Sequence, residues 1–298
     1  MNGTRPWSIV GADGRSIGGV RAGPDAGRRA LFVHGVPASG ENLRFLDLAG
    51  DAIAAAGVAC VAVDRPGIGF SSPHAVAPRD AADGAAAAAD DMAAVLDGLA
   101  WPDATVIVHS AGAFAALTFA ARHPERVRRL VLIAAAAPSM DAPEAAEMDP
   151  KARSFFDLCA QRPVSAAWVL RLMRVGMLVA PGPATRSAAA DLPPPDRALI
   201  DDPRASAAFG AMLRHGLRRG PAGSVIDGRT ARGPWPLEAR DVRCPVDVYG
   251  GDRDRNVPIG VARAWAERLG DARLVPMVGE GHVSVLPAVA ERVLESVA

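Results

Sequence analysis

The stretch Ala104-Thr-Val-Ile-Val-His-Ser-Ala-Gly-Ala-Phe-Ala-Ala-Leu117 contains the pattern that decides the fold. Its first part is a short apolar run typical of a buried strand, and its second part is rich in alanine and favours a helix. Ser110 lies where the strand ends and the helix begins. A serine at such a turn is held in a strained backbone conformation, with its hydroxyl exposed at the positive end of the helix. Ser110 is therefore the first candidate for a residue that carries chemistry.

Short runs of similar composition recur along the chain. The predicted strands are residues 7–10, 18–22, 29–34, 58–63, 105–108, 127–133, 246–249 and 273–276. Several are continuous apolar runs, as expected of strands covered on both faces. The first two, joined through Gly-Ala-Asp-Gly-Arg, predict an antiparallel hairpin at the edge of the sheet. From Arg29 onward, strands alternate with helical patterns. This alternation predicts an α/β fold with a mostly parallel eight-stranded sheet and helices on both faces.

The strand rhythm stops between about Pro138 and Pro236, where prolines and helical spacing replace it. We predict that residues 138–236 form a helical cap, inserted into a core domain made of residues 1–137 and 237–298. One predicted cap helix, residues 164–180, is apolar nearly all round. We expect this helix to bury more than one face, one against the core and another along a substrate pocket, although core packing alone explains most of its residues.

The composition of the chain limits the classes of ligand and partner that it favours. The chain has 298 residues, of which 50% are hydrophobic, and it balances 33 basic against 33 acidic side chains. Without a basic run, nucleic acid and anionic membranes are not favoured as partners, and a small, uncharged or mildly polar ligand fits better. We expect a cytoplasmic protein, because the sequence has no signal-peptide pattern and no apolar run of about 18 residues. The three cysteines have neither disulfide nor metal spacing and are expected to be buried.

Serine is a weak nucleophile, so Ser110 needs a base within hydrogen-bond reach, and the base needs an orienting acid. Open α/β sheets place such groups beyond the carboxyl ends of their strands. His282 lies in Gly-Glu-Gly-His after the last predicted strand, and Asp254 lies in Gly-Gly-Asp-Arg-Asp after the preceding strand. The best candidates therefore occur in the order Ser110, Asp254, His282.

That order resembles the α/β-hydrolase superfamily, whose triads run nucleophile, acid, base along the chain. The resemblance covers nearly the whole chain outside the cap. His34-Gly-Val-Pro37 is similar to the oxyanion loop of the family, Asp64-Arg-Pro-Gly-Ile-Gly-Phe-Ser71 to its glycine turn, and Arg122-His-Pro-Glu-Arg-Val127 to its link into the strand before the cap. The segments around Asp254 and His282 match the acid and histidine loops.

One position departs from the family. Glycine is usual two residues before the nucleophile, but this chain has Val108, and only Gly112 on the helix side is retained. We expect a β-branched residue there either to widen the strand-to-helix turn at Ser110, called the elbow below, or to be accommodated by the small neighbours Ala111 and Ala113. The departure concerns the geometry of the elbow more than the role of Ser110.

Other residues compete for the acid and base roles. Asp252 falls where a surface residue is normal, and Asp141 follows a strand end that supplies the acid only in some relatives, whereas Asp254 has the family spacing to Val257-Pro258. The remaining histidines, which we expect to be structural or exposed, are His34, His74, His109, His123 and His215.

The resemblance also implies an oxyanion hole made by the backbone N–H groups of Val36 and Ala111, since Pro37 has no N–H. It implies a serine hydrolase that cleaves a small or medium apolar ester, thioester or lactone through an acyl-enzyme, with no metal or organic cofactor. Met, Leu, Trp, Phe and Val of the cap are expected to set the apolar preference.

Several other functions remain open on the same fold. Carbon–carbon bond hydrolases, perhydrolases and non-hydrolytic biosynthetic enzymes share it, and a catalytically slow ligand-binding or signalling protein is the alternative from another class. Dehalogenases and epoxide hydrolases are disfavoured because they need a carboxylate nucleophile. Proline iminopeptidases are similar in the His34 and Asp64 regions, but they favour a Gly-Gly-Ser-Trp-Gly elbow and acidic cap residues.

Overall fold

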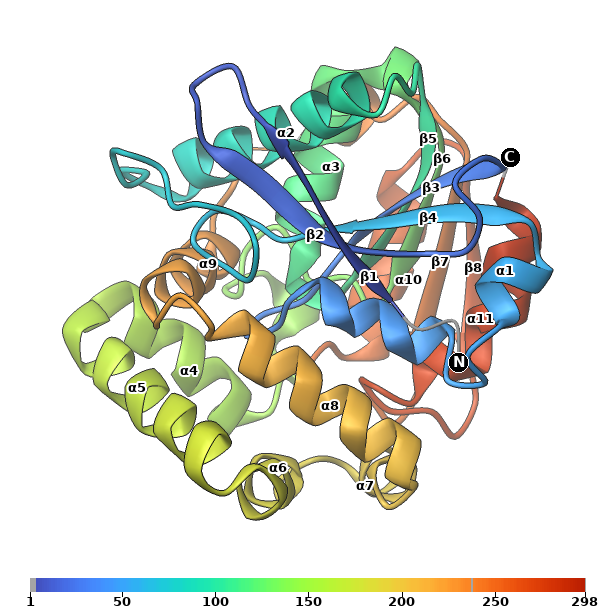
Figure 1. The fold of residues 1–298 in the computed structure, drawn as a ribbon. Helices are drawn as coiled ribbons and strands as arrows, with labels where there is room; N and C mark the ends of the chain where they lie inside the picture. Colours follow the sequence, from blue (N-terminus) through green and yellow to red (C-terminus); the bar gives the residue numbers. More distant parts are fainter. Residues whose placement is uncertain (1–3, 237, 298) are drawn as a thin grey trace.

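The computed structural model describes residues 4–236 and 238–297, which fold around one eight-stranded sheet (Figure 1). The strands are β1 (Arg5–Val10), β2 (Ser16–Ala22), β3 (Arg28–Val33), β4 (Val58–Val63), β5 (Ala104–His109), β6 (Val127–Ile133), β7 (Val246–Gly251) and β8 (Ala272–Met277). Their order across the sheet is β1-β2-β4-β3-β5-β6-β7-β8. β2 pairs antiparallel with β1 and β4, and the other pairs are parallel. The predicted α/β fold, with its edge hairpin, is confirmed.

Register brings the candidate segments to one edge of the sheet. Val108 of β5 pairs with Val33 of β3 and with Leu132 of β6, and Ile133 pairs with Tyr249 of β7. Because these strands are parallel, the loops that follow β3, β5, β7 and β8 all leave from the same edge. Residues far apart in sequence can therefore meet there.

Helices cover the sheet on both faces. One face carries α2 (Ala81–Gly98), α3 (Ala113–Arg122) and α10 (Ile259–Arg268), and the other carries α1 (Ala52–Ala55) and α11 (Val285–Ser296). Every residue of β4 and β5 is buried, whereas β1 and β8 at the edges have exposed positions. The continuous apolar runs of the central strands therefore reflect burial from both sides.

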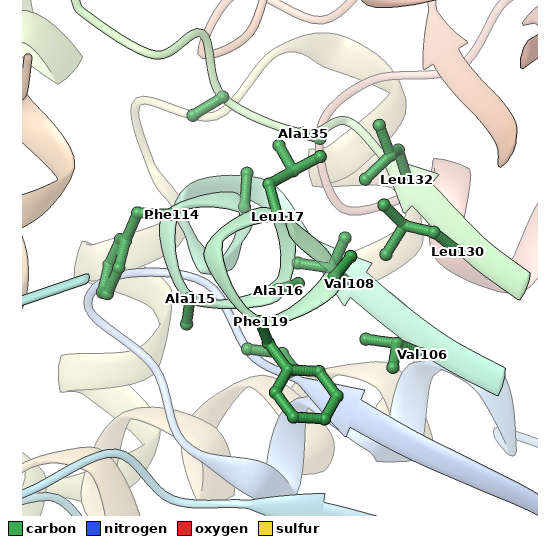
Figure 2. Packing of buried hydrophobic residues seen from close by; sticks show 14 of the residues in the cluster. Val106, Val108, Phe114, Ala115, Ala116, Leu117, Phe119, Leu130, Leu132 and Ala135 are labelled. Carbon is green, nitrogen blue, oxygen red and sulfur yellow. The ribbon is translucent and has the colours of Figure 1, made fainter. Parts of the chain in front are cut away.

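The strand-to-helix turn after β5 is tightly packed. Figure 2 shows Val106 and Val108 of β5 beside α3, together with Leu130 and Leu132 of β6. A Cβ atom built at Gly112 would lie 2.5 Å from the His34 carbonyl oxygen and 3.0 Å from a γ-carbon of Val108. The absence of a side chain at Gly112 thus leaves room for Val108 at this turn.

In the described residues between β6 and β7, where the cap is predicted, the chain forms six α-helices, and Figure 1 shows them grouped at one end of the molecule. They are α4 (Pro150–Gln161), α5 (Pro163–Val179), α6 (Pro181–Ala189), α7 (Pro194–Ile200), α8 (Pro203–Gly216) and α9 (Ala222–Arg232). The first five begin with proline, whose fixed φ suits the first helical position and whose missing N–H costs nothing there. The prolines of this segment therefore divide it into short helices.

Helix α5 corrects one expectation. We expected it to bury more than one face, but the spacing Trp168, Leu172, Val175 and Val179 marks a face that lies in solvent. Leu172 is 69% exposed and Val179 is 79% exposed. The buried residues of α5 are Ala166, Leu170 and Met177. An apolar helical stripe shows that a face exists, but the packing of neighbouring helices decides which face is covered.

Among the residues that the structure describes, no helix combines the length and apolar character needed to cross a lipid bilayer. The three cysteines are free and buried. Burial raises the pKa of the Cys159 thiol to about 12.

The packing at the elbow predicts opposite effects for two Gly→Ala substitutions. Gly112→Ala places its Cβ against the His34 carbonyl and should lower the free energy of unfolding by about 2–3 kcal/mol. Gly176→Ala, in α5, meets only ordinary contact with Ala184 and should raise stability by about 0.5–1 kcal/mol. Urea unfolding measures both, and equal stability of the two variants would contradict the packing argument.

Candidate active site

Ser110 sits at the junction between β5 and α3, in a single 3₁₀ turn that spans Ser110–Gly112. Its φ is +57°, in the left-handed region that non-glycine residues rarely adopt. Its carbonyl accepts a hydrogen bond from the N–H of Ala136 at 3.1 Å, which ties the turn to the segment after β6. The strained serine expected from the sequence is therefore present, and its side chain faces a cavity beyond the sheet edge.

His282 and Asp254 extend from Ser110 in one hydrogen-bonded line. The Nδ1–H of His282 donates to Asp254 Oδ2 at 2.7 Å, and its Nε2 accepts from the Ser110 hydroxyl at 2.9 Å. All three residues are buried. The carboxylate acceptor places the proton of neutral His282 on Nδ1, which leaves the Nε2 lone pair for the serine.

Asp254 is held by its own loop, since its Oδ1 accepts the backbone N–H groups of Asn256 and Val257 at 2.8 and 2.9 Å. The competing aspartates lie elsewhere. Asp252 is exposed and accepts the N–H of Gly279, and Asp141 pairs with Arg232 on the surface. The structure therefore brings only one of the three candidate acids to His282.

The charge around His282 favours its protonated form. Burial opposes a charged imidazole, but the charge and hydrogen bond of Asp254, helped by the charge of Asp196, outweigh burial and raise the pKa of His282 above its ordinary value. The Asp254 carboxylate thus stabilises an imidazolium at this position.

The other histidines have separate surroundings. His109 Nε2 donates to the His282 carbonyl at 2.9 Å, and burial lowers the pKa of His109 to about 3, so it is neutral. His34 donates from Nδ1 to the Gly35 carbonyl, and His215 bonds Asp64 at 2.9 Å. His123 packs against the ring of Phe119, and His74 lines a separate groove.

The two residues predicted to supply oxyanion donors line the same cavity as Ser110. Val36 and Ala111 line it together with Ser110 and His282. Within the described part of the chain, the Val36 N–H donates to no protein acceptor, and Ala111 lies in the first turn of a helical segment, where N–H groups lack intrahelical partners. Their role as oxyanion donors stays a prediction of the family resemblance.

Arg65 sets the direction of the Val36 amide. This buried guanidinium donates to the carbonyls of His34 and Gly35, the latter at 2.8 Å. In a trans peptide, the C=O and N–H point in opposite directions, so a fixed Gly35 carbonyl also fixes the Val36 N–H. Arg65 is itself paired with buried Asp227 of α9 at 2.7 Å.

Two adjoining cavities meet at Ser110, with volumes of about 160 and 290 Å³. Both are lined by Val36, Ser110, Phe155, Asn256 and His282, and neither is lined by lysine, arginine, aspartate or glutamate. The first is closed by Met140, Met148 and Phe156, and the second by Leu170, Met173, Phe209 and Leu213. Of the side-chain types expected from the cap, tryptophan is wrong, because exposed Trp168 lines neither cavity.

The described residues contain no cluster of three or more His, Cys, Asp or Glu side chains that could hold a metal ion. The groups that meet at Ser110 are its own hydroxyl, an imidazole and a carboxylate, beside the backbone N–H groups of Val36 and Ala111. This set suits proton transfer, nucleophilic attack and oxyanion stabilisation.

A serine at a strand-to-helix elbow, in line with a histidine and an aspartate at the carboxyl edge of a mostly parallel sheet, defines the class of α/β-fold hydrolases. Comparison with known families agrees, since the family described as "alpha/beta hydrolase fold" matches residues 31–288. The chain belongs to the alpha/beta hydrolase family.

Solved structures share this fold along the whole chain. An esterase from Rhodococcus sp. has a TM-score of 0.69 and 21% identity, with 100% of each chain covered. An enol-lactonase from Burkholderia xenovorans has a TM-score of 0.67 and 16% identity, covering 97% of this chain and 98% of the other. An epoxide hydrolase from Vigna radiata has a TM-score of 0.67 and 17% identity, covering 99% and 98%. No curated protein matches the sequence.

Sequence reasoning missed three residues around this site: Arg65, Asp227 and Asp196. Arg65 lies in the segment 64–71 that is similar to the glycine turn of the family, but the neighbouring residues do not indicate what its guanidinium binds. Asp227 and Asp196 lie in cap helices without a motif, 162 and 86 residues from their partners Arg65 and His282. No local signal marks either carboxylate, since Asp227 lies in a helix with several other polar residues and Asp196 directly follows three prolines.

The buried Arg65–Asp227 pair makes a stability prediction. Asp227→Ala leaves the guanidinium buried without its carboxylate and should lower the free energy of unfolding by about 3–5 kcal/mol. Asp191→Ala removes an exposed pair with Lys151 and should change it little. Urea denaturation compares the two variants, and similar small losses in both would show that the buried pair does not hold the cap to the core.

Proposed function

We propose that the protein is a serine hydrolase that cleaves a small or medium apolar ester, thioester or lactone through an acyl-enzyme. Ser110 is the nucleophile, His282 the base and Asp254 the orienting acid, with residues 138–236 as the cap. The observation that carries the proposal is the buried hydrogen-bonded line Ser110–His282–Asp254 at the meeting point of two cavities without charged side chains.

The geometry supports an acyl-transfer cycle. His282 Nε2 takes the proton of the Ser110 hydroxyl as the serine oxygen attacks the substrate carbonyl, and Asp254 stabilises the imidazolium that forms. The same Nε2–H then protonates the leaving group. Water attacks the acyl-enzyme with His282 again as base, which releases the acid and restores the serine.

The backbone N–H groups of Val36 and Ala111 stabilise the oxyanion of the tetrahedral intermediate. Each such donor typically contributes about 3 kcal/mol to the transition state. Arg65 supports the first donor because it fixes the peptide plane that carries the Val36 N–H.

The cavity linings support a neutral, apolar substrate. Methionine, phenylalanine, leucine and valine side chains line the two spaces on either side of Ser110, and burying a charged substrate group there would lack a partner. The same absence of a carboxylate in both linings disfavours an aminopeptidase, which must hold a free amine.

Serine at position 110 also separates this proposal from epoxide hydrolysis, the activity named for one structural neighbour. An alkyl-enzyme ester requires a carboxylate nucleophile, and a serine alkoxide at this position favours acyl chemistry. Carbon–carbon bond hydrolysis, perhydrolysis, non-hydrolytic synthesis and slow ligand binding use the same fold. The following experiments distinguish an active serine hydrolase from a slow ligand-binding protein.

Ser110→Ala should abolish both covalent labelling by a fluorophosphonate and hydrolysis of a panel of nitrophenyl esters, because no other hydroxyl bonds His282 Nε2 in the described residues. The wild-type protein should label once, at Ser110, with the acyl-length profile of the panel reporting the size of the acyl site. Ser284→Ala is the matched control: Ser284 lies beside His282 but bonds the Gly281 N–H, so this variant should still label. A wild-type protein that neither labels nor turns over any ester would exclude the hydrolase proposal.

Asp254→Asn should lower kcat by about 10⁴, because an amide cannot stabilise the imidazolium and favours the wrong tautomer of His282. Asp252→Asn should leave kcat near the wild-type value, since Asp252 contacts the Gly279 N–H and not His282. Steady-state kinetics with the best ester of the panel test this pair. A large loss in Asp252→Asn with little effect of Asp254→Asn would reverse the assignment.

A further inference from the structure

The loop that carries His282 donates backbone hydrogen bonds to a carboxylate from the cap. Asp196, in the first turn of α7, is fully buried. Its Oδ2 accepts the N–H of His282 at 2.9 Å, and its Oδ1 accepts the N–H groups of Val283 and Ser284 at 2.9 and 2.8 Å. One side chain of the cap thus binds three consecutive backbone donors next to the imidazole.

This contact is electrostatically favourable and sterically specific. The three N–H groups precede α11, which begins at Val285, so the carboxylate lies at the positive end of that helix. Gly281 permits the approach, since a Cβ atom there would lie 2.5 Å from Asp196 Oδ1. The energy of three charge-assisted hydrogen bonds is available only when α7 is docked on the loop.

The remaining polar contacts of the loop come from the core. The N–H of Gly281 donates to Ser284 Oγ, and His109 donates to the His282 carbonyl. Without Asp196, the three N–H groups of residues 282–284 would lose both carboxylate oxygens that accept their hydrogen bonds. The position of the imidazole relative to Ser110 therefore depends on a residue from a different part of the chain.

We propose that Asp196 is a positioning residue through which the docked cap holds His282 in line with Ser110, so that cap closure and assembly of the triad are one event. This inference rests on the proposed function for the roles of Ser110 and His282. Asp196 lines neither cavity, so it acts on the reaction through the histidine loop and not through substrate contact.

A second cap carboxylate acts in the same way on the other half of the site. Asp227 of α9 holds Arg65, and Arg65 holds the carbonyls beside the Val36 amide. The base and the oxyanion donor are thus each fixed by a buried carboxylate from the cap. Displacement of the cap would release both, which confines a fully aligned site to the closed form.

Asp196→Asn tests the proposal with the least change in volume. If the amide oxygen keeps the bonds to Val283 and Ser284, the new NH₂ faces the N–H of His282, so the defect falls on the catalytic loop itself. We expect kcat to fall on the order of 10²-fold with KM nearly unchanged, the cost of misplacing a catalytic group by about 1 Å.

The pH profile gives a readout that a merely structural role would not move. The groups facing His282 are Asp254, Asp196 and the neutral His109. Because the negative charge of Asp196 raises the pKa of His282, its removal lowers that pKa. His282 acts as base when neutral, so the acid limb of kcat/KM should move to lower pH in Asp196→Asn.

Asp201→Asn is the matched control, an exposed aspartate at the end of the same helix, and it should keep the wild-type kcat and acid limb. Amide hydrogen exchange in residues 279–285 should be faster in Asp196→Asn than in wild type or in Asp201→Asn. This measurement needs no activity, so it tests whether the hydrogen bonds of Asp196 hold the His282 loop even if the hydrolase proposal fails. Unchanged exchange would show that Asp196 does not hold the His282 loop. Faster exchange together with a wild-type kcat and a wild-type acid limb would overturn the positioning role.

If Asp196→Asn does not fold, Gly281→Ala tests the same contact with the carboxylate retained, because its Cβ displaces Asp196 from the loop. The folded Gly281→Ala variant should show the same fall in kcat and the same faster exchange. Wild-type kcat in this variant would overturn the proposal.

Discussion

The hydrogen bond between His282 Nδ1 and Asp254 Oδ2 joins the loops after β7 and β8 and fixes the tautomer that Ser110 meets. It exists because parallel strands deliver both loops to one edge of the sheet, and because Asn256 and Val257 donate to the other carboxylate oxygen. Burial of this pair makes its charge effective, since little solvent screens it. The turn at Ser110, the core and the cap all help to keep Ser110, His282 and Asp254 within hydrogen-bond distance of one another.

Close packing at the strand-to-helix turn is the steric constraint that holds Ser110, as the Asp254 hydrogen bond holds His282. The left-handed backbone of Ser110 is tolerated because its surroundings over-determine it: the sheet on one side, α3 on the other and the Ala136 N–H on its carbonyl. Val108 stands where the family pattern that the sequence resembles has glycine, and the absence of a Cβ atom at Gly112 leaves room for it. The elbow therefore keeps its geometry although its sequence pattern has changed.

The cap contributes charge as well as an apolar lining. Its hydrophobic side chains shape two cavities, while Asp196 and Asp227 reach into the core to meet backbone donors and Arg65. Such buried carboxylates are costly unless fully paired, so their contacts are favourable only in the docked arrangement. The segment that lines the two cavities is therefore also bonded to the His282 loop and to Arg65.

The sequence by itself determined the sheet, its edge hairpin, the strand-to-helix turn at Ser110 and the order of the candidate triad, because each is written in local periodicity or in short motifs. The resemblance to the family also ranked Asp254 above Asp252 and Asp141, and the contact with His282 falls on Asp254. The tertiary structure alone decided which face of α5 is exposed, how Val108 is accommodated, and that Asp196 binds the His282 loop while Asp227 binds Arg65. These features arise from contacts between distant segments, and a hydrophobic pattern specifies that a face will be buried without specifying its partner.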